Sequence, residues 1–129
     1  MKDLLQAACK ARQAAYAPYS GFAVGAAVRA GSGRIYSGCN IENASYGLTI
    51  CAERVAVFQA IAAGERSLEE LAVVADTALP VAPCGACRQV MAEFGIKNVC
   101  LAAVNGASQV MKLEALLPHA FSSNAMGVE

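Results

Sequence analysis

Three cysteines in two short motifs constrain the fold of this chain more than any other feature. Cys51 is followed two residues later by Glu53, and Cys84 and Cys87 stand together in the segment Pro83-Cys84-Gly85-Ala86-Cys87. Three thiolates can hold a zinc ion and leave its fourth position free for water, but only if the fold brings both motifs together. We therefore expect a fold in which two segments far apart in the sequence meet at one point.

Apolar spacing and turn residues predict helices that alternate with strands. Thr49 is the expected N-cap of the second helix, which places Cys51 and Glu53 in its first turn, and Cys84 is expected to open the third. The expected helices span residues 2–16, 49–63, 84–94 and 113–117, and the expected strands span 22–30, 34–40, 68–76, 99–104 and 108–112. This order predicts one α/β domain over residues 1–129, a three-layer α/β/α sandwich with a mixed five-stranded sheet.

Charge and composition exclude several classes of partner. Ten basic and ten acidic side chains balance without a block of like charge, which argues against a polynucleotide. No apolar run is long enough to span a membrane, and the start, Met1-Lys2-Asp3, does not lead into a secretion signal, so we expect a cytoplasmic protein. The apolar fraction of 57% exceeds the usual ~45–50%. We therefore expect part of the surface to be buried against other copies of the chain.

The six cysteines divide into two groups. An even count permits disulfides, but cytoplasmic thiols stay reduced. Cys9, Cys39 and Cys100 lie in apolar or periodic stretches, and we interpret them as buried free thiols, since free cysteine behaves as a small hydrophobe. The motif cysteines are left as the group with a chemical context.

Both motifs fall at predicted helix starts, where unpaired N–H groups carry partial positive charge. Three thiolates leave a zinc centre with a net negative charge, which Arg54 can reduce by donating to a thiolate. Glu53 can take a proton from zinc-bound water and pass it to a substrate nitrogen. This chemistry fits the hydrolytic loss of ammonia from an aminopyrimidine.

Other interpretations of the motifs stay open. A CxxC pair alone is more typical of a structural zinc site or a redox site. A redox site does not explain Cys51 and Glu53, whereas Glu53 as a solvated carboxylate and Arg54 as an ordinary surface arginine remain alternatives. A structural zinc site normally has four protein ligands. None of the candidates for a fourth ligand lies in a paired motif: Cys9, Cys39, Cys100 and His119.

Four segments together resemble a known family: YAPYSGFAVGAA, GCNIENASYG, TICAER and PCGACRQV. They are similar to the small, homotetrameric cytidine deaminases of the cytidine and deoxycytidylate deaminase family. The Cys-x-Glu and P-C-x-x-C signature is shared with zinc deaminases of nucleic acids and of other small molecules. The resemblance covers about residues 16–121. Within it, the FAVGAA and NIEN segments are similar to those of deaminases that act on free nucleosides.

The resemblance implies zinc-dependent deamination of cytidine and 2′-deoxycytidine to uridine and 2′-deoxyuridine, with release of ammonia, in pyrimidine salvage. It implies one zinc ion per subunit on Cys51, Cys84 and Cys87, with Glu53 as the proton shuttle. The competing hypotheses are deamination of an aminonucleoside antibiotic such as blasticidin S and a zinc-stabilised module without catalysis. His119 has no role in a three-cysteine site.

The resemblance also implies contacts with the substrate. Phe22 would stack near the base, Asn40 and Glu42 would bind the ribose hydroxyls, and Ala52 would line the same site. The alternatives are core packing for Phe22 and turn formation for Asn40 and Glu42. In a homotetramer with shared active sites, three residues would reach into a neighbouring subunit's site: Ala44, Tyr46 and Phe121.

Overall fold

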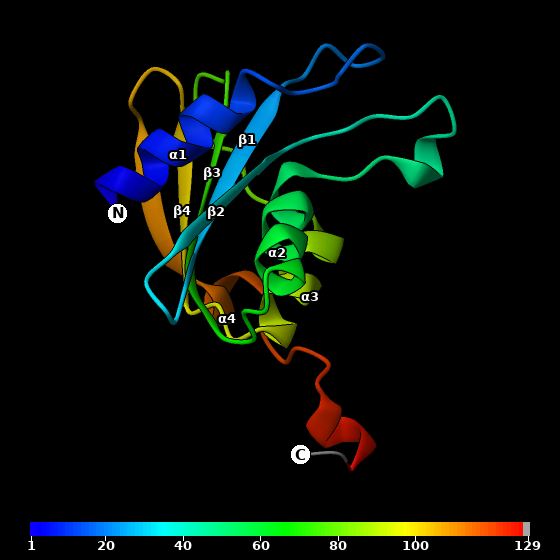
Figure 1. The fold of residues 1–129 in the computed structure, drawn as a ribbon, viewed down its shortest axis with the longest axis vertical. Coiled ribbons are helices and arrows are strands. Elements are labelled where there is room, and N and C mark those ends of the chain that lie inside the picture. The colour runs from blue at the N-terminus through cyan, green and yellow to red at the C-terminus, as the bar shows by residue number, and fades with distance from the viewer. Residues whose placement is uncertain (128–129) are drawn as a thin grey trace.

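The computed structural model describes residues 1–127 and centres on a five-stranded sheet with helices on both faces (Figure 1). The strands are β1 (Val24–Ala30), β2 (Ile35–Cys39), β3 (Leu68–Ala75), β4 (Asn98–Ala103) and β5 (Ser108–Lys112). The helices are α1 (Lys2–Arg12), α2 (Ala52–Ala62), α3 (Gly85–Glu93) and α4 (Leu113–Leu116), with short 3₁₀ helices η1 (Tyr46–Leu48) and η2 (Ser123–Met126).

The sheet has the order β2-β1-β3-β4-β5, in which only β3 and β4 run parallel and all other neighbours are antiparallel. One face is covered by α1 and the other by α2, α3 and α4. The prediction of a three-layer α/β/α fold with a mixed five-stranded sheet is therefore confirmed. Within residues 1–127, no helix combines the length and the apolar character that crossing a membrane requires.

Successive residues of the central strands face opposite sides of the sheet, as strand geometry requires. Ala26 and Val28 of β1 pack in the cluster that includes α2 and α3, whereas Ala27 packs against Leu4 and Ala8 of α1. β3 is buried on both faces over most of its length, as its continuous apolar run predicts. The end of β3 is therefore buried between the two layers of helices.

Two glycines allow the helices to approach the sheet closely. A Cβ on Gly25 of β1 would lie 2.0 Å from the carbonyl oxygen of Ala8 in α1. A Cβ on Gly38 of β2 would lie 2.6 Å from the backbone nitrogen of Ala56 in α2. Any side chain at Gly38 would displace α2, whose first turn carries part of the site described below.

Asn40 sets two boundaries that differ from the predicted ones, one through its side chain and one through its backbone. The side chain accepts from the Val24 nitrogen over 2.9 Å and donates to the Phe22 carbonyl over 2.7 Å, so β1 begins at Val24 and not at residue 22. The backbone nitrogen of Tyr16 donates to the Asn40 carbonyl over 3.0 Å. This bond draws Tyr16 toward the sheet, and α1 ends earlier than predicted, at Arg12.

The prediction that Thr49 is the N-cap of α2 is wrong. Its Oγ1 accepts from the backbone nitrogen of Asn43 over 3.1 Å, and Cys51 occupies the N-cap position with an extended backbone. Cys84 occupies the same position in α3, also with an extended backbone. Neither cysteine uses its side chain as a cap, so both thiols are free to point at a common centre.

The expectation of three buried free thiols holds only for Cys100. Cys9 is exposed and Cys39 is half-buried. Cys9 follows the buried Ala8 in α1, and one residue turns an α-helix by about 100°, so the Cys9 side chain leaves the face that packs on the sheet.

Candidate active site

Three cysteine sulfur atoms meet where α2 and α3 begin. The Sγ atom of Cys84 lies 3.8 Å from that of Cys51 and 3.4 Å from that of Cys87, and all three lie within 4.8 Å of one another. Ligands at a Zn–S distance of about 2.3 Å in a tetrahedron are about 3.8 Å apart. The three sulfurs therefore fit one zinc ion, and no fourth Cys, His, Asp or Glu within residues 1–127 joins them. Such a site keeps one coordination position open.

Arg54 lies against the thiols, where its Nη2 donates to Cys51 Sγ over 3.5 Å. A hydrogen bond from Cys87, reinforced by Arg54, lowers the pKa of Cys51 to about 5. The same contact with Cys51, together with burial, raises the pKa of Cys87. Arg54 therefore favours the thiolate form of Cys51 and offsets part of the negative charge that the complete site would carry.

Glu53, in the first turn of α2, is buried with only 5% of its surface exposed. Burial raises the pKa of its carboxyl group to about 7, and the negative charge of Cys51 acts in the same direction. A carboxyl group with a pKa near neutrality can both accept and donate a proton at physiological pH. Such a shift on a buried group in a pocket is typical of a catalytic residue.

A pocket of about 220 Å³ opens beside these groups, and half of the predicted site residues line it. Phe22, Asn40, Ala52 and Glu53 line it together with two of the thiols. The sequence predicted no role at the site for the remaining lining residues, which are Val24, Thr49, Val73, Ala75, Val81 and Ala82. Two of them stand at the carboxyl end of β3. Because ligands of α/β folds bind beyond the carboxyl ends of parallel strands, this rule could have identified them.

Glu42 lies outside this pocket, in a neighbouring hollow of about 390 Å³ that shares Thr49 with it. Its carboxylate accepts hydrogen bonds from the Ser20 hydroxyl and from the backbone nitrogens of Tyr19 and Ser20, the last two over 2.9 and 3.1 Å. The bond from the Ser20 hydroxyl, followed by those from the two backbone nitrogens, lowers the pKa of Glu42. Glu42 is therefore a fixed anion beside the pocket.

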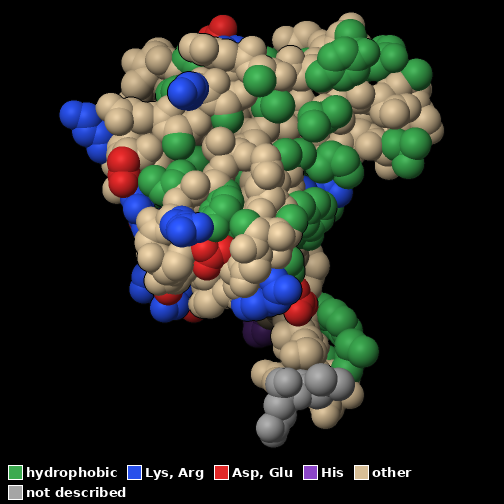
Figure 2. Space-filling model, viewed as in Figure 1, with side chains coloured by type: hydrophobic (Ala, Val, Ile, Leu, Met, Phe, Trp, Pro, Cys, Tyr) green, Lys and Arg blue, Asp and Glu red, His purple; other side chains and the backbone are tan. Residues whose placement is uncertain are grey.

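The residues expected to serve a neighbouring subunit do not line the pocket of their own chain. Ala44 and Tyr46 lie on the segment 41–49, which projects from the body of the molecule, and Phe121 lies on the C-terminal tail, which projects elsewhere (Figure 1). Tyr46 is 75% exposed and Phe121 is 62% exposed. Figure 2 shows hydrophobic side chains gathered over the projecting loops, where Tyr19 and Leu48 are also exposed.

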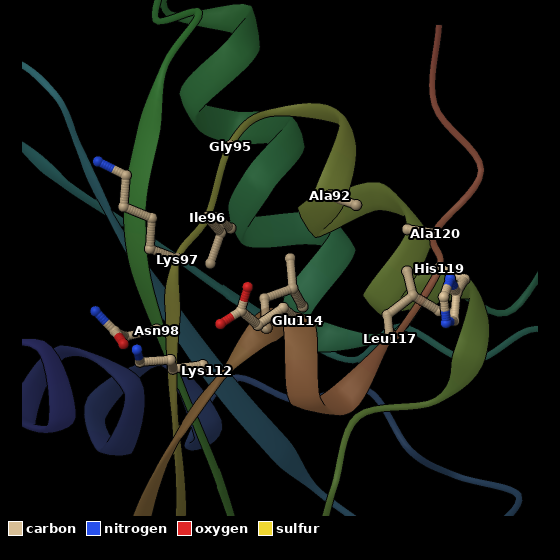
Figure 3. A pocket seen from close by; sticks show the side chains of 11 residues that line it. Ala92, Gly95, Ile96, Lys97, Asn98, Lys112, Glu114, Leu117, His119 and Ala120 are labelled. Carbon is tan, nitrogen blue, oxygen red and sulfur yellow. The ribbon is translucent and has the colours of Figure 1, made fainter. Parts of the chain in front are cut away.

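A larger groove, of about 620 Å³, lies at the other end of the parallel strand pair, where β4 begins (Figure 3). It contains His119 but none of the residues that the sequence predicts for the site. Lys97 and Lys112 are exposed there, and Lys97 pairs with Glu69 over 3.5 Å. The groove therefore has a solvated, charged rim and no buried group suited to proton transfer.

A family model and the sequences of known proteins agree on one family. The model of the cytidine and deoxycytidylate deaminase zinc-binding region matches residues 1–103. A cytidine deaminase of Sporosarcina psychrophila is 53% identical over 95% of this chain and 91% of that protein. A cytidine deaminase of Halalkalibacterium halodurans is 51% identical over 95% of both chains.

Solved structures agree with the sequence comparisons. The crystal structure of cytidine deaminase from Burkholderia pseudomallei matches with a TM-score of 0.89 and 52% identity, over 93% of this chain and 98% of that chain. The structure of cytidine deaminase from Mycobacterium tuberculosis matches with a TM-score of 0.81 and 42% identity, over 93% of this chain and 95% of that chain. Both the layers and the helix starts that carry the thiols fall within a fold already seen in this family.

Proposed function

The chain belongs to the cytidine and deoxycytidylate deaminase family, and from this premise we propose that it is a zinc-dependent cytidine deaminase. It hydrolyses cytidine and 2′-deoxycytidine to uridine and 2′-deoxyuridine and releases ammonia. The observation that carries the proposal is the buried Glu53 beside three thiols, in a pocket that Phe22 and Asn40 also line.

The three cysteines hold the zinc ion, which supplies the Lewis acidity that makes water a nucleophile at neutral pH. Glu53 carries the proton transfers. As a carboxylate it accepts a proton from the attacking water, and as a carboxylic acid it donates that proton to the ring nitrogen next to the reacting carbon. Glu53 then moves the proton of the new hydroxyl group to the amino group, so that the C–N bond breaks, ammonia leaves and the carbonyl group of the uracil ring forms. Burial raises the pKa of Glu53, which favours the protonated form that donates to the substrate.

The substrate contacts follow from the pocket. Phe22 packs against the pyrimidine ring, and Ala52 borders it beside Glu53. Asn40 keeps one N–H and one lone pair beyond its two backbone bonds, which suit a ribose hydroxyl. Glu42, held as an anion by Ser20, accepts from a second hydroxyl once the nucleoside extends into the neighbouring hollow.

We further propose a homotetramer with shared active sites. The support is the exposure of apolar side chains on loops that project from the body, since such a surface is typical of contacts between copies. Sedimentation should give the mass of a tetramer, and a monomer mass would remove the proposed roles of three residues in a neighbour's site: Ala44, Tyr46 and Phe121.

The proposed setting is pyrimidine salvage in the cytoplasm, with residues 1–129 forming one domain. The balanced charge supports a free nucleoside and not a polynucleotide as substrate.

The test is turnover by the purified zinc-loaded protein with four substrates: cytidine, 2′-deoxycytidine, blasticidin S and single-stranded DNA. We expect the loss of cytosine absorbance with both nucleosides and little turnover of the other two. Absence of cytidine turnover with zinc bound would contradict the proposal. Faster turnover of blasticidin S or of DNA would assign the same site to another deaminase class.

A further inference from the structure

Arg88 follows the thiol Cys87 by one residue, and none of the roles described above uses it. Its side chain is half-buried and forms two hydrogen bonds with backbone carbonyls. Nε donates to the carbonyl of Pro83 over 2.8 Å, and Nη1 donates to the carbonyl of Leu116 over 2.6 Å. Pro83 belongs to the loop before α3, and Leu116 is the last residue of α4. One guanidinium group therefore joins two elements that are distant in sequence.

The bond to Pro83 acts on Cys84, because this carbonyl belongs to the peptide group that links the two residues. The backbone nitrogen of Arg88 also donates to the carbonyl of Cys84 over 3.1 Å. Arg88 thus holds the backbone on both sides of the Cys84 Cα atom. The side chain of Cys84 makes no capping bond of its own, so these contacts set the direction of its thiol.

Within residues 1–127 no ion pair includes Arg88, so the contacts of its guanidinium group are the hydrogen bonds with carbonyls. The next residue adds a second link, since Gln89 Nε2 donates to the carbonyl of Phe121 over 2.8 Å. Two successive residues of α3 therefore hold the segment 113–121 against this helix.

We propose that Arg88 is a positioning residue, which holds the Cys84 thiolate in place for zinc by bracing the Pro83–Cys84 peptide group against α4. The planar guanidinium group is required, because its donors form a rigid fork that reaches both carbonyls at once. A lysine ammonium, which is a compact point charge, does not reproduce this geometry. The inference rests on the zinc site of the proposed function but not on the identity of the substrate.

The experiment measures how fast the zinc-loaded enzyme releases zinc to an excess of a coloured chelator. The variants are Arg88→Ala, Arg88→Lys and the control Arg66→Ala. Arg66 is a matched arginine, since its Nη1 also donates to two carbonyls, those of Ile61 and Glu65, over 2.9 and 2.7 Å. It does so beyond the end of α2, at the opposite end of the helix from Cys51.

We expect Arg88→Ala to release zinc about 10- to 100-fold faster than the wild type, as loss of an outer partner of a metal ligand does. Arg88→Lys should release zinc at a rate between those of the wild type and Arg88→Ala. Arg66→Ala should release zinc at the wild-type rate. In cytidine turnover, Arg88→Ala should lower kcat more than it raises KM, because the substrate contacts remain.

Zinc release from Arg88→Ala at the wild-type rate, with only a lower melting temperature, would show a general structural role and overturn the proposal. If Arg88→Ala does not fold, Arg88→Lys decides, and wild-type zinc release from it overturns the requirement for the fork. Zinc release does not depend on any substrate. Failure of the proposed deaminase activity would therefore leave this result interpretable.

Discussion

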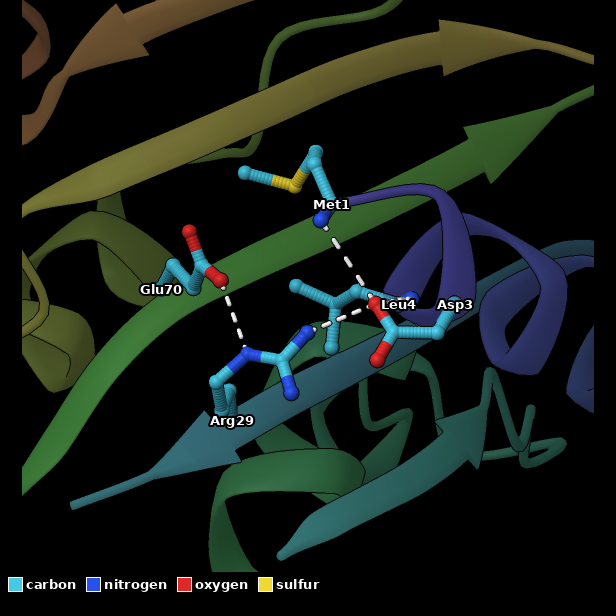
Figure 4. Close-up of polar contacts among 5 residues, drawn as sticks. All are labelled: Met1, Asp3, Leu4, Arg29 and Glu70. Carbon is cyan, nitrogen blue, oxygen red and sulfur yellow. Dashed lines mark hydrogen bonds and ion pairs between the residues drawn. The ribbon is translucent and has the colours of Figure 1, made fainter. Parts of the chain in front are cut away.

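The two faces of the sheet carry different kinds of charged group. On the face covered by α1, Arg29 lies between Asp3, at 2.7 Å, and Glu70, at 2.8 Å, and the N-terminal ammonium lies 3.5 Å from Asp3 (Figure 4). Asp3 is exposed, Arg29 and Glu70 are half-buried, and the four charges neutralise one another. On the face covered by α2 and α3, Glu53 is buried near the Cys51 thiolate. Burial and this negative charge raise the pKa of its carboxyl group.

The charges on the α1 face are arranged for structure, whereas those on the other face suit chemistry. Exposed ion pairs contribute little to stability, about 0–1 kcal/mol each. A buried carboxylate near other anions costs stability and persists where a reaction needs it. We therefore expect substitutions on the α2 and α3 face to change activity and matched substitutions on the α1 face to leave it unchanged.

The largest effect should come from Glu53→Gln. The amide has nearly the same shape but cannot shuttle a proton, so kcat should fall by about 10²–10⁴ while zinc stays bound. Steady-state kinetics and metal analysis of the same sample measure both. The matched control is Glu70→Gln on the α1 face, which should keep wild-type kcat. Wild-type activity in Glu53→Gln would contradict the expectation that the two faces of the sheet differ in their importance for activity.

Arg54→Gln should have the next largest effect. Loss of the cation that donates to Cys51 leaves the thiolate charge less balanced, which should weaken zinc binding or lower activity by about 10- to 100-fold. Competition with a chelator measures the zinc affinity, and cytidine turnover measures the activity. Arg29→Gln should change neither, and equal effects of the two substitutions would contradict the assignment of Arg54 to the site.

Gly25→Ala and Gly38→Ala test the two faces with the same chemical change. Each added methyl would lie within 3 Å of helix backbone, so each should lower the free energy of unfolding by about 1–3 kcal/mol in denaturant titrations. Gly38→Ala should also lower kcat, because it displaces α2 and with it Cys51 and Glu53. A loss of kcat in Gly25→Ala at a temperature where it is folded would show that α1 also positions the site.

The smallest effect should be that of Asp3→Asn. The hydrogen bond from Arg29 holds the pKa of Asp3 below its ordinary value of 3.8. A lowered pKa in the folded state stabilises the protein above pH 3.8, and this contribution disappears as the pH falls through the folded value. Wild type and Asp3→Asn should therefore differ slightly in unfolding free energy at neutral pH and converge in acid. A constant difference at every pH would contradict the ion-pair account.

Much of the metal centre could be predicted from the sequence, because local patterns determine it. Cys51 and Cys84 each precede an Ala-rich or periodic segment, which predicts a helix start at both places. Only the N-cap predicted at Thr49 is wrong, since Cys51 occupies that position. The error at Thr49 has a physical cause, since its hydroxyl bonds a backbone group across the loop, at Asn43. Single-sequence patterns do not reveal such a contact.

Other features depend on contacts that no local pattern records. The position of Glu42 outside the pocket follows from its hydrogen bonds with Ser20, and the two side-chain bonds of Arg88 go to carbonyls that only the fold brings together. Tyr46 is 75% exposed, and its proposed contact with another copy of the chain lies beyond what the pattern of one chain records.

One zinc ion on three thiolates, with Glu53 beside it, is what the proposed cytidine deaminase activity requires. The most direct measurement adds zinc stepwise to metal-free protein and follows cytidine turnover and bound metal in each sample. We predict that turnover rises in proportion to bound zinc and saturates at one ion per chain. Full turnover without zinc, or none at one zinc per chain, would contradict the claim.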